Sequence, residues 1–528
     1  MGLAADSSKN WGDAWKSFFN RRVIALLFLG FSAGLPILLI FSSLSLWLRE
    51  AGVERSAVTF FSWAALGYSF KFVWAPLVDR IPLPVLHDLL GRRRSWLLLS
   101  QASVIAALLF MAAHNPAEGL FWIACGAVML GFSSATQDIV IDAYRIEAAD
   151  DDLQAMMSSA YIAGYRVGML VAGAGTLALA SWFTMTDEGN YDYLAWAWAY
   201  RCMAVFMLIG VVTTLMVAEP DVDRTSESVH STVDYLRFLL LFALAATVFV
   251  ISFTQLADAF GALKTFLVET GLSTPIAGFL AGAGRFAGSV AAAGVTAWLL
   301  VKVHLAPRAM VKETYVAPFA DFFERYGKVA IYILLLVGTY RIADIVMGTI
   351  SNVFYNDMGY TKEQIATITK TFGLIMTIVG GFLGGVLAIR FGVLRILWVG
   401  ALLAALSNVL FAFLANLEPS SLYLSLVIAA DNLSGGMSSA AFIAFLSSLT
   451  NRAFTAMQYA IFSSLMTLLP KLLAGYSGTF VDSLDYPVFF IGSALLGLPV
   501  LWLVSYVGRL LERHEAVTKT YSEEGSCS

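Results

Sequence analysis

The sequence predicts an all-α polytopic membrane protein with about 14 transmembrane helices, arranged as two six-helix halves plus two inserted helices. Of its 528 residues, 59% are hydrophobic and 13% are charged, which is far too apolar for an ordinary soluble globule. Apolar runs of about twenty residues recur, long enough for helices to cross a membrane, whereas barrel strands would alternate in segments of about ten. Short motifs of the first half also recur at one fixed spacing in the second half.

Six apolar runs predict an N-terminal six-helix bundle over residues 23–218. The expected spans are 23–48, 56–79, 95–113, 119–144, 155–182 and 195–217. The first run is longer than the apolar core of a signal peptide, and no small-residue cleavage site follows it. We therefore expect residues 1–22 to be a cytoplasmic N-terminal segment and the first run to be a transmembrane helix.

The bundle is followed by a polar linker at 219–234, rich in Asp, Glu, Ser and Thr, whose composition cannot cross a bilayer. Two inserted transmembrane helices are expected within 235–303, and residues 304–327 predict an amphipathic cytoplasmic segment. A C-terminal six-helix bundle is expected over 328–508, before a cytoplasmic tail at 509–528. Its spans are 328–354, 362–389, 393–415, 421–449, 453–479 and 486–508.

The distribution of basic residues predicts the orientation in the membrane. Most of them precede the first span or fall in loops and tails on the same side as it: Lys9, Lys16, Arg21, Arg22, Arg80, Arg92, Arg93, Arg94, Arg145, Arg390, Arg395, Arg452, Arg509 and Arg513. The opposite short loops are largely acidic or neutral. Because cytoplasmic loops carry an excess of Lys and Arg, both termini are expected to be cytoplasmic.

An internal repeat indicates how the helices are grouped. Gly131-Phe-Ser-Ser-Ala135 recurs as Gly436-Met-Ser-Ser-Ala440, 305 residues later, and Arg166 recurs at the same spacing as Lys471. Two matches at one spacing indicate a duplicated six-helix unit. Parallel repeats with a substrate site between the halves resemble the plan of major facilitator transporters.

Two loops resemble the facilitator signature of Gly, Asp-Arg, Gly and a basic cluster. In the first half, Asp79 and Arg80 precede Gly91 and three arginines, whereas in the second half Ile389 replaces the acid. An acid at a helix end can accept hydrogen bonds from arginines and from a neighbouring helix N-terminus. We expect a cytoplasmic gate in the first half, with the setting of topology as the alternative role for the arginines. Its candidate residues are Asp79, Arg80, Arg92, Arg93 and Arg145.

Asp138 and Asp142 lie four residues apart in an apolar run, so a helix presents both carboxylates on one face. An acid at membrane depth costs several kcal/mol on most scales, which indicates a functional role. Both are the first candidates for proton coupling, followed by Asp344 and Asp431. Asp142 has a second interpretation as a gate acid, because it lies close to Arg145 at the cytoplasmic end.

Several motifs together resemble the AmpG muropeptide permeases: Gly34-Leu-Pro36, Ser69 to Arg80, Gly91-Arg-Arg-Arg-Ser-Trp96, Ala135-Thr-Gln-Asp-Ile-Val140, Gly164 to Leu170, Tyr340 to Asp344, Lys370 to Gly373, Asn432 to Met437 and Ala456 to Tyr459. The resemblance implies a proton-coupled importer of the bacterial inner membrane. Its substrate would be N-acetylglucosamine-anhydro-N-acetylmuramic acid and its peptides, carried to the cytoplasm for cell-wall recycling, with an influence on β-lactamase induction and hence antibiotic resistance. Acetyl-coenzyme A transporters share two of the motifs and provide the rival substrate.

A muropeptide site needs aromatic faces, amides and fixed cations. The candidate substrate-binding residues are Tyr68, Lys71, Trp74, Gln137, Tyr161, Tyr165, Arg166, Tyr340, Arg341, Lys370, Asn432, Gln458 and Lys471. Packing within the bundle is the alternative role for the aromatic residues, and a structural ion pair is the alternative for the cations. Arg341 and Asp344, three residues apart, are a candidate pair of that kind.

Other classes of function find little support. The basic residues form only short clusters and the net charge is −4, so no nucleic acid partner is expected. No metal-ligand spacing, ATP-binding loop or Ser-His-Asp arrangement is visible, so we expect no cofactor beyond a proton gradient and no catalytic residues. A membrane-bound enzyme is kept as a second alternative. The expected partners are the substrate, protons and membrane lipid, and a monomer is expected by analogy with the fold.

Overall fold

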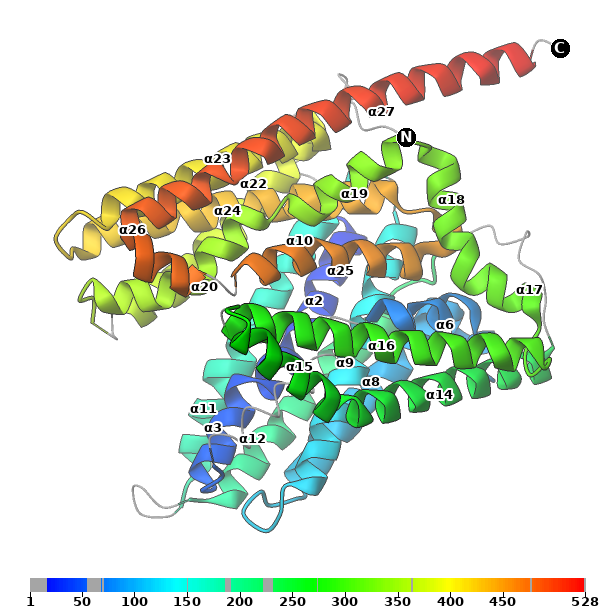
Figure 1. The fold of residues 1–528 in the computed structure, drawn as a ribbon, viewed down its shortest axis with the longest axis horizontal. Helices are drawn as coiled ribbons and strands as arrows, with labels where there is room; N and C mark the ends of the chain where they lie inside the picture. Colours follow the sequence, from blue (N-terminus) through cyan, green and yellow to red (C-terminus); the bar gives the residue numbers. More distant parts are fainter. Residues whose placement is uncertain are drawn as a thin grey trace. The chain divides into compact units, whose positions relative to one another are not determined.

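The computed structural model is helical throughout the residues that it describes, which are 17–54, 68, 71–149, 151–185, 191–221, 231–272, 274–361, 364–474 and 477–526. The chain divides into two compact units. The larger unit combines Met1–Val222 with Arg325–Ser528, and the smaller unit is Asp223–Glu324. Figure 1 shows the larger unit as a blue to blue-green N-terminal half and a yellow-green to red C-terminal half.

The N-terminal half begins with α2 (Arg21–Ile40) and α3 (Ser42–Glu50), which make one span with a break at Phe41. Most of the expected span 56–79 lies outside the described residues, and its described end forms η3 (Lys71–Val73) and α6 (Ala75–Arg80). The other elements are α7 (Leu86–Leu90), α8 (Arg92–Ala112), α9 (Phe121–Glu147), α10 (Asp151–Leu170), the π-helical turn η4 (Val171–Gly175), α11 (Thr176–Phe183), α12 (Tyr193–Phe206) and α13 (Leu208–Met216).

The C-terminal half has the same order of long helices. It contains α19 (Val329–Thr339), α20 (Ile342–Asp357), the π-helical η6 (Ile365–Phe372), α22 (Gly373–Phe391), α23 (Val393–Leu414), α24 (Ser421–Leu449), η7 (Arg452–Phe454), α25 (Thr455–Ala474), α26 (Ser477–Leu495) and α27 (Gly497–Ser526). Asp485, with φ of 64°, divides α26 into two helical pieces. The last helix continues well beyond the expected end of its span at 508, because no proline or glycine follows Gly508 until Gly525.

By length and composition, 12 helices within the described residues can span a membrane. They correspond to every expected span except 56–79 and 453–479. The first of these lies mainly outside the described residues. The second is represented by α25, some of whose side chains are not described. The all-helical class is therefore confirmed, and the total of about fourteen spans stays a prediction.

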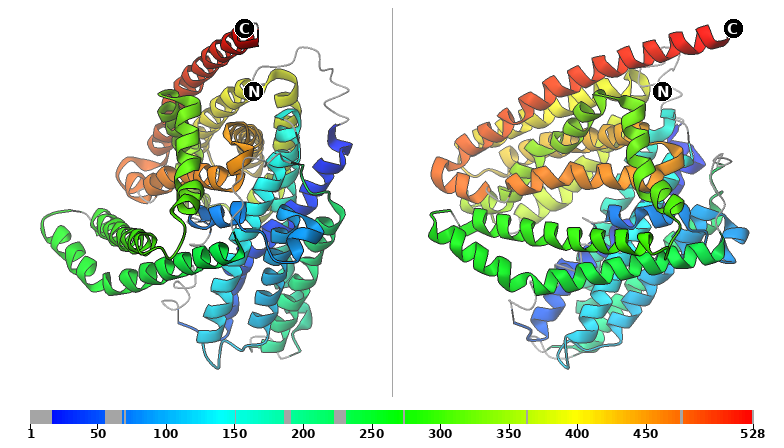
Figure 2. Two further views of the ribbon diagram at one scale, coloured as in Figure 1. Left: turned by 90° about the vertical axis from the view of Figure 1, so that its right-hand side faces the viewer. Right: turned by 45° about the vertical axis from the view of Figure 1, so that its right-hand side comes forward.

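The smaller unit is a helical hairpin with a short extension. It consists of α14 (Thr232–Gln255), α15 (Ala257–Glu269), α16 (Thr274–Lys302), α17 (Arg308–Val311), the π-helical η5 (Lys312–Val316) and most of α18 (Ala317–Tyr326). Figure 2 shows α14 and α16 in green, running side by side. Arg285 of α16 donates from Nε to the carbonyl oxygen of Phe253 at 2.6 Å, so its charge is used to join the two helices.

Glycines allow very close packing of α2 against α10, the contact that positions the site described below. A Cβ atom at Gly30 or Gly34 would meet the backbone oxygen of Tyr161 or Tyr165, and a Cβ at Gly164 would meet that of Leu27. Small residues permit this approach of two helix backbones. As a result, the side chains of α10 are held at a fixed distance from those of the neighbouring α9.

A half-buried tyrosine joins two loops and the end of α3 at the opposite end of the N-terminal half. Tyr191 accepts a hydrogen bond from Nε1 of Trp47 at 3.1 Å and donates to Asn115 Oδ1 at 2.8 Å. Burial raises the pKa of Tyr191 to about 12, so its hydroxyl stays protonated and able to donate at physiological pH.

Candidate functional site

The two acids predicted on α9 share a lysine from the neighbouring span. Lys71 Nζ, on η3, lies 2.9 Å from Asp138 Oδ2 and 3.5 Å from Asp142 Oδ2. The side chain of Lys71 is 7% exposed, and those of Asp138 and Asp142 are 15% and 8% exposed. Lys71 therefore forms a structural ion pair, the role that the sequence analysis gave as the alternative to substrate binding.

The second oxygen of Asp138 is also occupied. Tyr161 of α10 donates its hydroxyl proton to Asp138 Oδ1 at 2.6 Å. A charged donor on one oxygen and a neutral donor on the other both stabilise the carboxylate. Asp138 is therefore held by three elements, η3, α9 and α10, and any change in its protonation alters contacts to all of them.

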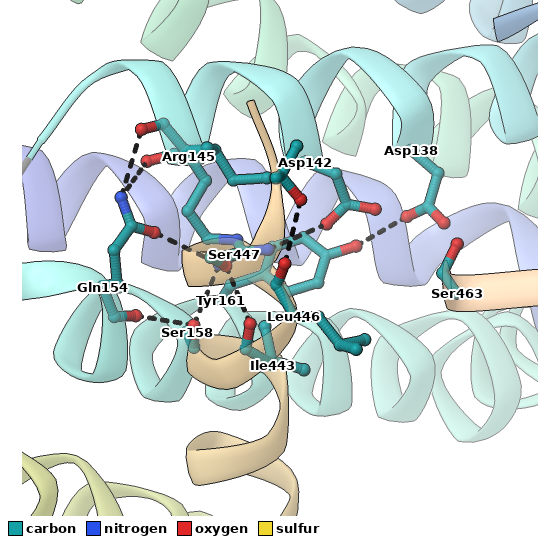
Figure 3. A network of polar contacts seen from close by, with 12 residues as sticks. Asp138, Asp142, Arg145, Gln154, Ser158, Tyr161, Ile443, Leu446, Ser447 and Ser463 are labelled. Atoms are coloured by element: carbon teal, nitrogen blue, oxygen red, sulfur yellow. Dashed lines mark hydrogen bonds and ion pairs between the residues drawn. The ribbon is translucent and has the colours of Figure 1, made fainter. Parts of the chain in front are cut away.

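Arg145, one turn beyond Asp142, connects this cluster to the C-terminal half, as Figure 3 shows. Its NH2 lies 3.5 Å from Asp142 Oδ1, and its NH1 donates to Ser158 Oγ at 3.0 Å and to Ser447 Oγ at 2.6 Å. Arg145 is fully buried. Ser447 stands 305 residues after Asp142, so one guanidinium contacts the same repeat position in both halves.

We call Lys71, Asp138, Asp142, Arg145 and Tyr161 the acidic network. It contains two carboxylates and two cations, so its charges balance when both acids are ionised. A balanced buried cluster avoids the large penalty of an uncompensated charge. Adding one proton to the network removes that balance, which is the chemical requirement for coupling a proton to a movement.

The predicted gate residues meet at the expected cytoplasmic side. Asp79, at the end of α6, accepts hydrogen bonds from the backbone N–H groups of Ala456 and Met457 at 3.1 and 2.9 Å. These groups belong to the first turn of α25 in the C-terminal half, where unpaired N–H groups favour a negative charge. Asp79 therefore joins the two halves of the larger unit.

A buried arginine supports Asp79 from within its own half. Arg93 donates from NH2 to Asp79 Oδ1 at 2.8 Å and from Nε to Glu147 Oε2 at 2.9 Å. Arg92 donates to the backbone oxygen of Asp79, and Arg80 lies over the ring of Phe454, 5.7 Å from its centroid. We call Asp79, Arg93 and Glu147 the latch.

Other contacts between the halves gather on the same side. Ser159 of α10 donates to the carbonyl oxygen of Gly381 at 2.6 Å, and Arg452 donates to that of Ala149 at 3.3 Å. Together with the latch, these contacts join the ends of α6 and α9 to the end of α24 and the start of α25, and the middle of α10 to the middle of α22. The two halves are thus joined at the expected cytoplasmic side.

The other two predicted acids lie in the C-terminal half. Asp431 of α24 accepts a hydrogen bond from Ser407 Oγ at 3.0 Å, and Asp344 of α20 lies 3.9 Å from Arg341 NH2. Asp344 is also close enough to Asp431 for their charges to interact. This second acidic pair is separate from the acidic network, and Arg341 with Asp344 forms the ion pair expected from their spacing.

Two cations, one from each half, lie close enough for their charges to interact. Arg166 of α10 is exposed, makes no hydrogen bond or ion pair with the described residues, and interacts electrostatically with Arg341. Arg341 stands at the break between α19 and α20, much as Phe41 breaks the first span. Paired interruptions of this kind in two repeats point to a substrate site in transporters.

Several other predicted substrate residues use their polar groups within the fold. Trp74 donates to Thr136 Oγ1 at 3.1 Å, Tyr340 donates to the Leu397 oxygen at 2.8 Å, and Gln137 donates to Ser32 Oγ at 2.9 Å. Asn432 accepts from Thr377 Oγ1 at 2.8 Å, and Gln458 accepts from Arg325 at 3.1 Å near the latch. These contacts match the packing alternative, and a role in substrate binding stays a prediction for each.

The remaining candidates are less constrained. Tyr165 lies beside Tyr161, with ring centroids 5.9 Å apart, Tyr68 packs against the core of the N-terminal half, and Lys370 is exposed on η6. Lys471 belongs to α25, but its side chain lies outside the described residues. The described residues contain no group of three or more His, Cys, Asp or Glu that could hold a metal ion.

Sequence reasoning missed three residues of this region. Glu147 pairs with Arg93, Glu219 accepts from the backbone N–H groups of Arg93 and Arg94 at 2.7 and 3.0 Å, and Ser447 receives Arg145. A signal for the two glutamates was their position at helix ends on the arginine-rich side. For Ser447 the signal was its position 305 residues after Asp142, which makes it the equivalent residue in the second copy of the repeat.

Comparison with known proteins identifies the class of this chain. The Major Facilitator Superfamily model matches residues 81–319 and 331–525, and the model described as acetyl-coenzyme A transporter 1 matches residues 22–127. The proton:xylose symporter XylE, solved with 6-bromo-6-deoxy-D-glucose, has the same fold, with a TM-score of 0.55 and 13% identity over 94% of this chain and 96% of XylE.

Curated relatives extend over nearly the whole chain. AmpG 4 of Rickettsia conorii is 29% identical over 492 residues, covering 93% of this chain and 98% of the relative. The anhydromuropeptide permease of Escherichia coli is 27% identical over 496 residues, covering 94% of this chain and 81% of the permease. These findings confirm the similarity to AmpG proteins predicted from the motifs. Since the superfamily model matches most of the chain, this multi-pass membrane protein is a transporter that belongs to the Major Facilitator Superfamily.

Proposed function

We propose that this protein imports anhydromuropeptides across the bacterial inner membrane into the cytoplasm, driven by the proton gradient. The substrates are N-acetylglucosamine-anhydro-N-acetylmuramic acid and its peptide forms, and the import serves cell-wall recycling. Through this flux the protein influences induction of β-lactamase. Similarity to the anhydromuropeptide permease over 94% of the chain supports this substrate class.

The observation that carries the proposal is the sharing of Asp142 between two cations. Lys71 bridges Asp138 and Asp142, while Arg145 contacts both Asp142 and Ser447 of the other half. A proton bound by Asp138 neutralises its carboxylate, which weakens the ion pair of Asp138 with Lys71. The ion pair of Lys71 with Asp142 then becomes stronger. Asp142 then holds Arg145 less tightly, and the contact between the halves changes. Proton binding thereby acts on the same contacts that open and close the cytoplasmic side.

The substrate is held by cations and aromatic residues between the two halves. Arg166 and Arg341 provide two guanidinium groups, which suit the carboxylates of a muropeptide because each can bind a carboxylate with two hydrogen bonds. Tyr165, beside Arg166, provides an aromatic face for a sugar ring. Binding of an anion between these two cations relieves their mutual repulsion.

In this proposal, fourteen spans place both termini in the cytoplasm, as the positive-inside rule predicts. The latch between Asp79 and α25 then lies on the cytoplasmic side and keeps that side closed. The substrate accordingly enters from the periplasm. Opening of the latch releases it into the cytoplasm.

Uptake into proteoliposomes tests the proposal. The wild-type protein is expected to accumulate labelled anhydromuropeptide only when a proton gradient is imposed, and Asp138→Asn is expected to reduce this accumulation to background while remaining folded. Asp88→Asn, which changes an exposed acid on α7, is the matched control and is expected to retain uptake. Accumulation by the Asp138→Asn variant against a gradient at the normal rate would contradict the coupling assignment.

A second candidate substrate is acetyl-coenzyme A or another anionic conjugate. The match of residues 22–127 to the acetyl-coenzyme A transporter model favours it. Competition distinguishes the two: unlabelled anhydromuropeptide is expected to suppress the uptake of labelled anhydromuropeptide, whereas an excess of acetyl-coenzyme A is expected to leave it unchanged. The reverse result would assign the conjugate as substrate.

A further inference from the structure

A cavity of about 1030 Å³ opens on the expected cytoplasmic side, apart from the acidic network. It is lined by the start of α2, the end of α9, the helices α12 and α13 with the residues that follow them, and Arg452 of the C-terminal half. Its volume is at the upper end of the range of small-molecule sites in proteins. None of the residues proposed to bind the substrate or the proton lines this cavity.

The lining of the cavity carries positive charge that is not paired within the described part of the chain. Arg21 and Arg22 are exposed, and neither guanidinium makes a hydrogen bond or ion pair with a described residue. Two acids of the lining are already bound elsewhere, because Glu147 pairs with Arg93 and Glu219 accepts from backbone N–H groups at the start of α8. Asp221 is the remaining acid of the lining.

Another part of the lining, which we call the apolar wall, is apolar and exposed. Its side chains lie on α2, α12 and α13, each of which belongs to a candidate membrane span: Ile24, Phe28, Val205, Leu208, Val212 and Met216. A wall of this composition continues the lipid-facing surface of the bundle. The lining of the cavity therefore combines a hydrocarbon-like surface with two arginines that are unpaired within the described residues.

We infer that this cavity binds one anionic glycerophospholipid of the cytoplasmic leaflet. Arg21 and Arg22 hold its phosphate, and an acyl chain lies along the exposed wall of α2 and α13. Arginine binds phosphate with two parallel hydrogen bonds, and basic pockets beside transmembrane helices are typical sites for anionic headgroups. A soluble phosphate would use the arginines but leave the apolar wall unfilled. A neutral or zwitterionic lipid would leave the two arginines without a net countercharge.

A lipid bound in this cavity is also expected to affect how stable the closed cytoplasmic side is. The lining includes Arg452 of the C-terminal half and Ala149 of the N-terminal half, whose carbonyl oxygen accepts a hydrogen bond from Arg452, so a bound lipid contacts a junction between the two halves. The lipid is therefore expected to stabilise the closed cytoplasmic side, since a ligand favours the state that it binds better.

Lipid binding to the full-length protein in detergent tests this inference. The wild type is expected to retain phosphatidylglycerol over phosphatidylcholine in native mass spectrometry and to unfold at a higher temperature when phosphatidylglycerol is added. The double variant Arg21→Gln/Arg22→Gln is expected to lose affinity for phosphatidylglycerol by roughly fivefold per arginine. Arg395→Gln, which removes an exposed arginine at the start of α23 outside the cavity, is expected to retain it.

A second variant keeps both arginines. Val212→Trp fills the apolar wall with a bulky side chain on an exposed position and is expected to weaken phosphatidylglycerol retention without changing the charge. Equal losses in Arg395→Gln and in the double variant would overturn the site, because general surface charge would then explain the binding. A stabilisation of equal size by inorganic phosphate or glycerol phosphate would overturn the lipid assignment.

Discussion

At the scale of single residues, each charged group of the acidic network depends on more than one partner. Lys71 serves two carboxylates and Asp142 serves two cations, with all of these side chains largely buried. Taking such groups out of water is expensive, and only the pairing repays that cost. Removing the cation that both acids share should therefore be far more damaging than removing it together with one of the acids.

Lys71→Met is expected to destabilise the protein by about 3 to 5 kcal/mol, because it leaves Asp138 and Asp142 buried without their shared cation. The double variant Lys71→Met/Asp138→Asn restores the charge balance and is expected to recover most of this loss. Thermal unfolding in one detergent measures both variants. Additive effects of the two substitutions would show that the pair does not interact.

At the scale of helices, the contact of α2 with α10 sets the position of Tyr161 relative to Asp138. This contact leaves no room for a methyl group at Gly164, where a Cβ would strike the backbone at Leu27. Backbone atoms cannot move aside as the tip of a flexible side chain can. Gly435, within α24, has no atom within 4 Å of a Cβ built on it.

Gly164→Ala is accordingly expected to destabilise the protein by about 1 to 3 kcal/mol, the usual cost of overpacking. Gly435→Ala is the matched control and is expected to be neutral or to stabilise by up to about 1 kcal/mol, because alanine favours the helix. Thermal unfolding of the two variants under identical conditions measures the difference. A Gly164→Ala protein as stable as the wild type would mean that the helices separate without cost.

Most helices were predictable from sequence because a membrane span needs a long apolar run, and such a run is visible in composition alone. The breaks at Phe41 and Arg341 and the π-helical stretches η4 and η6 were not, because each falls within or beside a run that hydropathy alone marks as one continuous span. The acids of the site stood out by their cost in an apolar run. Their partners did not, since Lys71 lies 67 residues from Asp138 and only the folded chain brings them together.

At the scale of the whole larger unit, the two halves meet at equivalent repeat positions that carry different residues in the two copies. The repeat keeps small residues at 131–135 and 436–440, while it places Asp142 in one copy and Ser447 in the other. Arg145 contacts both of these residues. The acid is therefore present on one side of the interface only. Under the proposed coupling, a proton bound there acts on the junction of the halves and not separately within each.

In the proposed mechanism, the latch sets how often the expected cytoplasmic side opens. Asp79 accepts two backbone hydrogen bonds from α25 across the halves, and a hydrogen bond to a charged group contributes about 1.5 to 3 kcal/mol. Asp79→Asn removes the charge and is expected to raise the ratio of open to closed molecules by at least about tenfold. Double electron–electron resonance between spin labels at Leu89→Cys and Arg395→Cys, with the native cysteines replaced by serine, measures the separation of the halves.

Asp192→Asn is the matched control for this experiment. Asp192 also accepts two backbone hydrogen bonds, from Met185 and Ala195, but both partners belong to its own half. Its substitution should weaken a helix cap and leave the distance distribution between the labels unchanged, whereas Asp79→Asn should add a population at longer distance. If the two variants give the same distribution, the hydrogen bonds from Asp79 to α25 do not hold the halves together, and the closed side depends on Arg145 and Ser159 instead.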